Sequence, residues 1–362
     1  MKIEDIDKNF KPATVGDRQV GYRDVTDAPF SLEGFPWGDP KAGQFFRLPA
    51  DMAAPADVNE GALWNAHNNT SGGCVRFRTD ATFISVRAKL HCPGDMNHMP
   101  RAGSAGFDIY AGPAGASHHV GTAQPNSGET DLERVLFNQP SWTPAMRDFT
   151  VNFPLYGGVE SVEIGLPPEA RVEAPAPHAF KPVLFYGSSI TQGGCASRPG
   201  NNYCSMLCRA VDAGQVNLGF SGCGRGEIAV ARAIASLDLG AFVMDYDHNA
   251  PNAEHLLATH EPFFKAVREA RPELPVVFMT MCNIWPDRGY EGCSRRREII
   301  RSTYERARLA GDRHVYFVDG ETLFGNYDRE ACTVDGCHPN DLGFYRMYEA
   351  VLPVLRRALA EA

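Results

Sequence analysis

The amino-acid sequence predicts an α/β domain over residues 176–362, preceded by an all-β sandwich over residues 1–175. Three observations support this prediction. In the first part, apolar and polar residues alternate over many short segments; in the second, apolar strands alternate with segments of helical period. A proline-rich stretch, LPPEARVEAPAP at residues 166–177, separates the two patterns and is typical of an extended connector.

The short segments of the first part have the pattern of strands that bury one face. Examples are residues 74–78, 82–88, 106–110 and 159–165, in which apolar and polar residues alternate with period two. Turns rich in Gly, Pro, Asn and Asp lie between these segments. Many short strands at fairly regular spacing predict a sandwich or jelly roll.

Strands and helices alternate along the second part. We expect strands at residues 183–187, 215–220, 241–245, 275–281 and 315–319. We expect helices at residues 202–213, 227–236, 253–269, 294–310 and 339–360. Because parallel strands need long crossover connections, this alternation predicts a parallel sheet with helices on both faces.

Composition excludes several classes of function. The net charge is -9, with acidic and basic residues interspersed, so the surface lacks the basic footprint of a protein that binds nucleic acid or an anionic membrane. No stretch approaches the roughly 20 apolar residues of a membrane span. The polar N-terminus lacks the apolar core of a signal peptide, so we expect a cytoplasmic protein.

The 10 cysteines predict buried thiols rather than a disulfide framework, because the chain is long and shows no secretory leader. The sequence contains neither a CxxC pair nor an HExxH motif, and His255 and His260 lack a zinc-ligand spacing. We therefore expect no metal site. A glycine-rich phosphate loop is also absent, so no organic cofactor is expected.

The segment YGSSITQGG, residues 186–194, follows the apolar run of the first predicted α/β strand. Ligand crevices in such sheets lie just beyond the carboxyl ends of the strands, so Ser188 and Ser189 lie where chemistry is usually done. A serine hydroxyl is a weak nucleophile and needs an adjacent base. His338 can supply that base, and Asp335 on the same loop can orient its ring.

An acyl-transfer site also needs hydrogen-bond donors for the oxyanion that forms on the substrate. Candidates are the backbone N–H of Ser189, the backbone N–H of Gly222 and the side-chain amide of Asn249, each just after a predicted strand. Glycine suits its position because the backbone must approach the substrate closely. Asparagine suits its position because its amide is a neutral donor that does not compete as a base.

These four segments together resemble the sequence blocks of the SGNH (GDSL-type) hydrolases, a superfamily named for Ser, Gly, Asn and His. GSSITQGG resembles the first block, NLGFSG the second and DGCHPND the fifth, while DYDHNAP stands where the third belongs. The resemblance implies a three-layer, flavodoxin-like domain with Ser189 as nucleophile and Asp335 and His338 completing the triad. It also implies an oxyanion hole formed by Ser189, Gly222 and Asn249.

Two positions depart from the family pattern. Ser188 replaces the usual aspartate of the first block, which is not the nucleophile. The third block usually reads Gly-x-Asn-Asp, whereas here Ala250 follows Asn249, so the aspartate that normally helps to hold the loop is missing.

The first part resembles the β-sandwich that precedes one bacterial branch of these hydrolases, in the runs CVRFRTDATFISVRAKL, GFDIYAG and FPLYGGVESVEIGL. That branch is similar to carbohydrate esterases. The resemblance implies a serine esterase that removes short acyl groups, most readily acetyl, from a sugar or oligosaccharide. It leaves the substrate sugar and a homo-oligomeric state open.

Other residues have two interpretations. His248 could contact substrate, although a hydrogen-bonded structural histidine fits better; Trp285 and Arg288 could line the cleft or pack in an exposed loop. For four residues of the first part, core or turn roles fit better than substrate contact: Trp64, His67, His98 and Trp142.

Two rival functions remain at this stage. One is a glycosidase on the same scaffold that uses Asp245 or Asp247 as its acid. The other is a carbohydrate-binding protein without catalytic activity.

Overall fold

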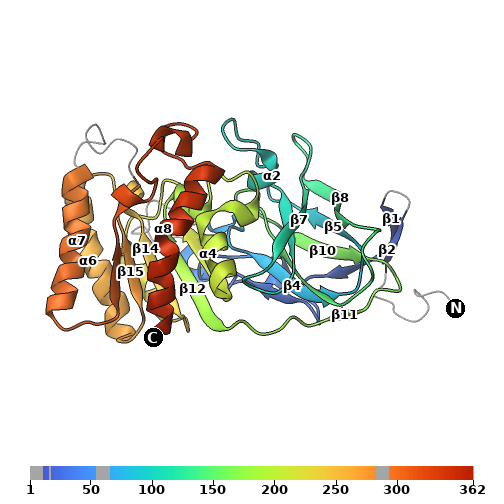
Figure 1. Cartoon of the computed structure of the whole chain (residues 1–362), viewed down its shortest axis with the longest axis horizontal. Helices are drawn as coiled ribbons and strands as arrows, with labels where there is room; N and C mark the ends of the chain where they lie inside the picture. Colours follow the sequence, from blue (N-terminus) through green and yellow to red (C-terminus); the bar gives the residue numbers. More distant parts are fainter. Residues whose placement is uncertain (1–10, 16–17, 54–65, 283–292, 362) are drawn as a thin grey trace.

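Two antiparallel sheets share one core in the first half of the computed structural model, which describes residues 11–15, 18–53, 66–282 and 293–361 (Figure 1). The first sheet has the order β1-β2-β10-β5-β8, from β1 (Lys11–Val15), β2 (Arg18–Asp24), β10 (Ser161–Leu166), β5 (Phe83–Lys89) and β8 (Asp131–Asn138). The second has the order β11-β4-β9-β6-β7, with β3 paired to β4, from β11 (Val172–Glu173), β4 (Cys74–Thr79), β9 (Arg147–Asn152), β6 (Phe107–Ala111), β7 (His118–Ala123) and β3 (Ser31–Glu33).

Alternate residues of these strands build the sandwich core. Phe77 and Ile109 from one sheet pack in the same buried cluster as Ile84 and Ile164 from the other. Because successive side chains of a strand point to opposite faces, the period-two pattern places every second residue in this cluster. The predicted β-sandwich is therefore confirmed.

The second half of the chain forms a parallel sheet of order β13-β12-β14-β15-β16. Its strands are β12 (Phe180–Gly187), β13 (Ala213–Gly219), β14 (Ala241–Asp245), β15 (Val276–Met279) and β16 (Val315–Val318). This is the flavodoxin-like strand order, in which the crevice lies where the chain reverses its direction of winding.

Helices cover both faces of this sheet, as Figure 1 shows. The helices α4 (Tyr203–Val211) and α8 (Asp341–Ala360) pack on one face, and α5 (Ile228–Ala235), α6 (Ala253–Ala270) and α7 (Cys293–Leu309) pack on the other. Along β12, Val183 and Phe185 enter the first core, while Leu184 and Tyr186 enter the second. An apolar run buried on both faces is what a central parallel strand requires, and the predicted fold class is confirmed.

Two short helices differ from the sequence-based expectation. A helix was not expected at α2 (Arg101–Ser104) within the sandwich, and the expected turn after β12 is the helix α3 (Ser189–Gln192). Segments of only four residues carry too little periodic pattern to be recognised from sequence. Among the described helices, none is both long and apolar enough to cross a lipid bilayer.

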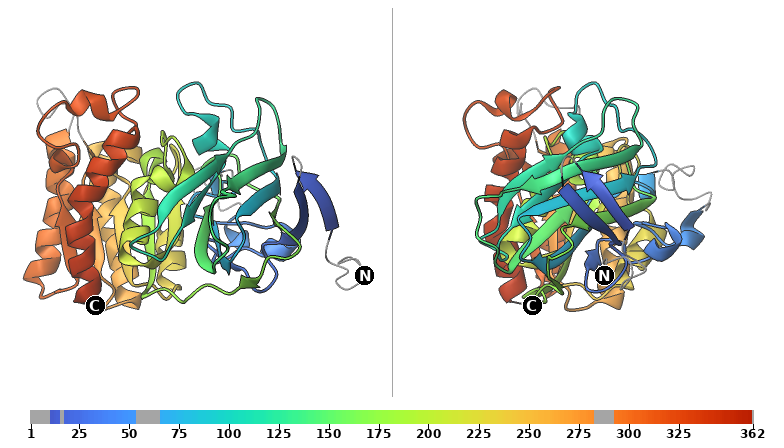
Figure 2. Two further views of the ribbon diagram at one scale, coloured as in Figure 1. Left: turned by 45° about the vertical axis from the view of Figure 1, so that its right-hand side comes forward. Right: turned by 90° about the vertical axis from the view of Figure 1, so that its right-hand side faces the viewer.

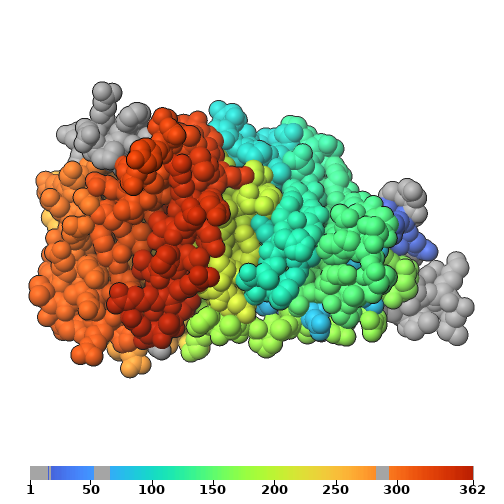
Figure 3. Space-filling model, in the orientation of Figure 1, coloured from blue at the N-terminus to red at the C-terminus, as the bar shows by residue number. Residues whose placement is uncertain are grey.

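The sandwich covers the open edge of the parallel sheet, where β13 lies (Figure 2). The guanidinium of Arg47, fully buried, donates from Nη1 to the carbonyls of Asn217 (3.0 Å) and Gly219 (2.8 Å). It also lies over the ring of Phe220, 4.8 Å from its centre. Edge carbonyls that would otherwise need water are thus satisfied by the sandwich, and the two parts meet along a broad boundary in Figure 3.

Candidate active site

The turn after β12 gives its two serines different roles. Ser188 is buried and is the N-cap of α3, its Oγ accepting a hydrogen bond from the N–H of Ile190 (3.1 Å). Ser189 is the first residue of α3 and lines a cleft of about 810 Å³. Gly187 allows the tight turn, because a Cβ there would lie 2.0 Å from Oγ1 of Thr191. The local structure therefore directs Ser189, rather than Ser188, into the cleft.

A continuous chain of hydrogen bonds joins Ser189 to the loop before α8. Oγ of Ser189 lies 2.8 Å from Nε2 of His338, and Nδ1 of His338 lies 2.7 Å from Oδ2 of Asp335. The other carboxylate oxygen, Oδ1, accepts the backbone N–H groups of His338 (2.8 Å) and Cys337 (3.0 Å). The loop thus closes on its own aspartate and presents the imidazole to the serine.

The electrostatics of Asp335 suit its place in this chain. Partial burial raises the pKa of Asp335, but the hydrogen bonds from the backbone and ring of His338 outweigh burial and hold this pKa below its ordinary value. An ionised Asp335 accepts the proton on Nδ1 of His338, which leaves the lone pair of Nε2 directed at Ser189. This is the tautomer that a base acting on a serine hydroxyl requires.

The two other candidate oxyanion residues lie on the same cleft. Gly222 follows β13 with φ of 72°, a left-handed conformation that favours glycine. Asn249 ends a short turn after β14, and its Nδ2 donates to the carbonyl of Phe220 (2.9 Å) and lies 3.5 Å from that of Gly187. The amide is therefore oriented by main-chain carbonyls of the neighbouring strand ends, in place of the aspartate that this third block lacks.

The cleft has a size typical of small-molecule sites. Its lining comes from the segments that follow β12, β13, β14 and β15, from the start of α6 and α7, and from the loop before α8. The lining residues are Ser189, Ile190, Ser221, Gly222, His248, Asn249, Pro251, Asn252, Ala253, Glu254, Met281, Arg295, Arg296, Cys337 and His338.

His248 lines the cleft and is also hydrogen-bonded. Its Nε2 lies 3.4 Å from Sγ of Cys282, and its Nδ1 lies 4.0 Å from Sγ of Cys337. Burial, with smaller effects of His338 and Arg296, lowers the pKa of His248 to about 3, so the ring is neutral at pH 7. The two other predicted contacts, Trp285 and Arg288, lie outside the described residues.

The carboxylates of the rival glycosidase interpretation are buried away from the cleft lining. Oδ2 of Asp245 accepts hydrogen bonds from Tyr203 (2.7 Å) and Thr191 (2.9 Å), and burial raises the pKa of Asp245 to about 7. Asp247 is paired with Arg296 at 3.1 Å. Both carboxylates hold neighbouring side chains at the end of β14 through these buried contacts. Neither is therefore placed to protonate a glycosidic oxygen in the cleft.

Sequence reasoning missed how the sandwich holds the loops of this site. Asp108, within the GFDIYAG run, is fully buried, and its Oδ2 accepts hydrogen bonds from Nη1 of Arg198 (2.9 Å) and the N–H of Gly200 (2.8 Å). In the same loop, the N–H of Ser197 donates to Asp341 at the start of α8, 2.8 Å away. The carboxylate of Asp108 within an apolar strand was the sequence signal from which this contact could have been predicted. Through the loop of Ser197, Asp108 connects the sandwich to the start of α8, next to the segment that carries His338.

A second set of contacts links the sandwich to the nucleophile helix. Nε2 of Gln192 donates to Oδ1 of Asn69 (2.9 Å), and Oε1 of Gln192 accepts the N–H of Ser221 (3.0 Å). The hydroxyl of Ser71 donates to the carbonyl of Gln192 (2.6 Å), and the hydroxyl of Tyr156 to that of Ser189 (3.3 Å). The sandwich therefore supports both the helix of Ser189 and the loop of Gly222.

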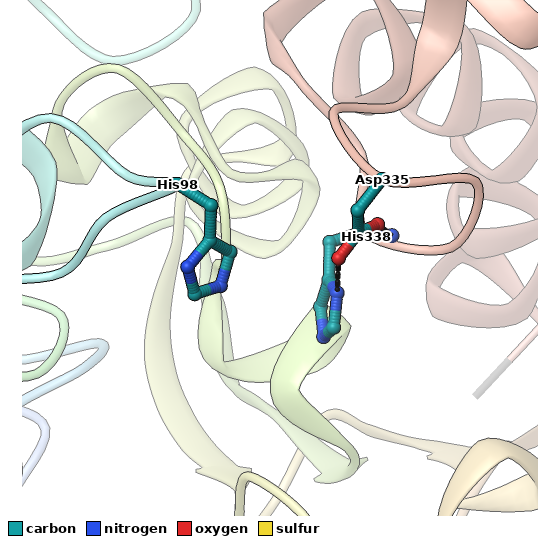
Figure 4. Close-up of side chains that lie close together, drawn as sticks. All are labelled: His98, Asp335 and His338. Carbon is teal, nitrogen blue, oxygen red and sulfur yellow. Dashed lines mark hydrogen bonds and ion pairs between the residues drawn. The ribbon is translucent and has the colours of Figure 1, made fainter.

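The four aromatic or imidazole residues singled out in the sandwich differ in position. His67 is buried, and Trp142 packs edge-on against Phe137, so both have core roles as expected. His98 lies on an exposed loop, as a turn residue would, but the loop brings its ring to 5.8 Å from the ring of His338 (Figure 4). This placement joins residues 240 positions apart and has no local sequence signal. Trp64 lies outside the described residues.

The same architecture occurs in solved structures. A protein described as a GDSL-like lipase from Bacteroides ovatus is 26% identical, with a TM-score of 0.81 over 94% of this chain and 98% of that chain. A salicylyl-acyltransferase from a tetracycline biosynthetic pathway is 19% identical, with a TM-score of 0.75 over 94% and 97%. An acetyl xylan esterase from the rumen bacterium Butyrivibrio proteoclasticus is 13% identical, with a TM-score of 0.60 over 94% and 100%.

Family comparisons cover both parts of the chain. Residues 180–356 match the GDSL-like lipase/acylhydrolase family, and residues 20–172 match the domain described as the N-terminus of SGNH-hydrolase-type esterases. Comparison with curated proteins gave no match. The chain belongs to the SGNH (GDSL-type) hydrolases and is a carboxylic ester hydrolase whose α/β domain follows an N-terminal SGNH-associated β-sandwich.

Proposed function

We propose that this esterase removes short acyl groups, acetyl above all, from hydroxyls of a sugar or oligosaccharide through an acyl-enzyme. The observation that supports it most directly is the hydrogen-bonded chain from Asp335 through His338 to Ser189, which ends on the cleft. A nucleophile, its base and the group that orients the base are the parts that serine acyl transfer needs.

In this mechanism, Oγ of Ser189 attacks the ester carbonyl while Nε2 of His338 accepts its proton. Asp335 stabilises the imidazolium that forms. The backbone N–H groups of Ser189 and Gly222 and the amide of Asn249 donate to the oxyanion of the tetrahedral intermediate. His338 then protonates the leaving alcohol. In the second half-reaction, His338 deprotonates a water molecule that attacks the acyl-enzyme and releases the acid.

The lining of the cleft supports a polar leaving alcohol. Asn252, Glu254 and Arg295 line it alongside Ser221, and side chains of these types hydrogen-bond the hydroxyls of a sugar. The acetyl xylan esterase among the solved structures is consistent with this substrate class.

We also propose that the two domains meet between residues 175 and 176. The two family matches end at residue 172 and begin at residue 180, and these limits flank the proposed boundary.

A fluorophosphonate probe followed by intact-mass measurement tests the nucleophile. The wild type and Ser188→Ala should each gain one adduct, because Ser188 caps α3 and is not the proposed nucleophile. Ser189→Ala should gain none and should lose ester hydrolysis. Labelling or ester hydrolysis that persists in Ser189→Ala would refute the assignment of Ser189 as the nucleophile. A wild type that gains no adduct and hydrolyses no ester would favour a rival function.

The substrate class is tested by acetate release from acetylated oligosaccharides, compared with hydrolysis of long-chain esters of the same alcohol. We expect kcat/KM to be highest for the acetylated sugars. Faster turnover of the long-chain esters would contradict the sugar ester assignment and point to a lipase.

A further inference from the structure

We propose that His98, Asp335 and His338 bind a divalent transition-metal ion, preferably Zn²⁺, between the two domains, and that this ion inhibits the enzyme. The inhibition rests on the proposed function, whereas the binding does not. The metal is not a cofactor of the reaction. It binds His338, the base of the triad, and so blocks that residue's role.

The geometry of these three side chains allows them to bind one metal ion together. Their potential ligand atoms all lie within 4.8 Å of one another. The rings of His98 and His338 meet edge to face, with an interplanar angle of 62°. Figure 4 shows His98 approaching from the sandwich side, across from the loop that carries Asp335 and His338. His98 and Asp335 are exposed, so an ion can enter from solvent.

His98 is prepared to act as a ligand. Its Nδ1 lies 2.8 Å from Oδ1 of the neighbouring Asn97, an acceptor, so Nδ1 carries the proton. The lone pair is then on Nε2, the form in which imidazole binds a metal. An outer hydrogen bond of this kind fixes the tautomer and orients the ring of metal-bound histidines.

The kind of ligand atom determines which metal ion is preferred. Two imidazoles and one carboxylate, with a water molecule as fourth ligand, suit Zn²⁺ at about 2.0–2.2 Å from each ligand. Tetrahedral ligands at that distance are about 3.4 Å apart. Nδ1 of His338 and Oδ2 of Asp335, now 2.7 Å apart, must therefore separate by about 0.7 Å, while His98 must approach them by up to about 1.4 Å. The exposed loop of His98 can supply this movement. Mg²⁺ and Ca²⁺ prefer oxygen ligands and should not compete.

Binding at Nδ1 of His338 has a direct chemical consequence. In the resting site, this nitrogen carries the proton that Asp335 accepts, and Nε2 accepts from the hydroxyl of Ser189. When the ion occupies Nδ1, the ring proton moves to Nε2 and the ring still carries one proton. Nε2 then has no lone pair for the serine proton, so attack on the ester stops until the ion leaves.

The test measures binding and inhibition separately, on the full chain without a polyhistidine tag. Zn²⁺ affinity is measured by competition with a chromophoric chelator in the wild type, in His98→Gln, and in His118→Gln as the control. His118 is an exposed histidine of β7 that belongs to no such cluster among the described residues. We expect His98→Gln to weaken Zn²⁺ binding at least tenfold, because even outer-sphere partners of a metal site contribute 10–100-fold.

Hydrolysis of an acetyl ester is then followed as Zn²⁺ is raised, with each variant's rate divided by its own metal-free rate. We expect inhibition of the wild type and of His118→Gln, its reversal by EDTA, an inhibitory concentration at least tenfold higher for His98→Gln, and no effect of Mg²⁺.

Equal Zn²⁺ binding by the wild type and His98→Gln would overturn the proposal, as would the absence of binding. If His98-dependent binding is found in a chain that hydrolyses no ester, the metal site stands and the proposed function fails. If an active enzyme binds Zn²⁺ through His98 and is not inhibited, the inhibitory role is refuted.

Discussion

The substitution Asp335→Asn separates the role of the carboxylate in folding its loop from its role in the reaction. The asparagine carbonyl can take the place of Oδ1 and accept the backbone N–H groups of Cys337 and His338. Its NH₂ group then faces Nδ1 of His338, where the wild type has an acceptor 2.7 Å away. The ring must turn to the tautomer with its proton on Nε2, so it can no longer accept the proton of Ser189.

The size of the effect follows from the geometry. A carboxylate and an imidazolium about 4 Å apart between charge centres, at an effective dielectric constant of about 20 for this partly exposed pair, attract by about 4 kcal/mol in the transition state. That energy corresponds to about a thousandfold in rate, and the wrong tautomer adds to it. We therefore expect kcat/KM to fall by roughly 10³–10⁴, with a change of only a few degrees in Tm.

The assay is hydrolysis of an acetyl ester, with thermal unfolding measured in parallel. Asp328→Asn is the matched control, because Asp328 is exposed and has φ of 48°, a conformation that asparagine adopts readily. This variant should retain full activity. A loss below tenfold in Asp335→Asn would refute the reasoning, since His338 would then be oriented without the carboxylate.

Three further predictions concern the surroundings of the triad. Asn249→Ala should lower kcat by 10²–10³ with little change in KM, because it removes one oxyanion donor; a loss below fivefold in steady-state kinetics would exclude that role. Asp108→Asn should lower kcat and leave KM nearly unchanged, because Arg198 loses its buried partner and the loop of residues 197–200, which contacts the start of α8, loses its support; Asp108→Glu should restore part of kcat if the carboxylate is what matters, and equal losses in both variants would contradict this. For Asp245, burial raises the folded-state pKa from 3.8 to about 7, so the folded chain holds a proton that the unfolded chain releases. The free energy of unfolding should therefore fall as pH rises through that window, by at most about 4 kcal/mol at about 1.4 kcal/mol per pH unit. In urea titrations from pH 4 to 8, Asp245→Asn should lack this component, and parallel curves for the two proteins would refute it.

Much of the fold was readable from local pattern. The period-two segments of the first part and the apolar runs of the second predicted a sandwich and a parallel sheet, and both are present. These patterns are reliable because burial of one face or of both faces is imposed on each strand separately. The short helix α3 was missed because four residues contain no helical period.

The residues at the strand ends were also readable as candidates. Parallel strands bring their carboxyl ends to one edge, so hydroxyl, glycine and amide residues after successive strands converge on a common crevice. Ser189, Gly222, Asn249 and His338 all line the same cleft in the structure. Their catalytic roles stay predictions until the variants are measured.

The sequence by itself thus determined the fold class, the family and a short set of candidate side chains, because periodicity and motif spacing are local properties. Only the tertiary structure decided what the sandwich contributes. Arg47 covers the edge of the parallel sheet, Asp108 holds the loop of residues 197–200 that contacts the start of α8, and His98 reaches the side of His338. Each of these contacts joins residues far apart in the chain, and such contacts depend on how two folded surfaces fit together, which no local pattern encodes.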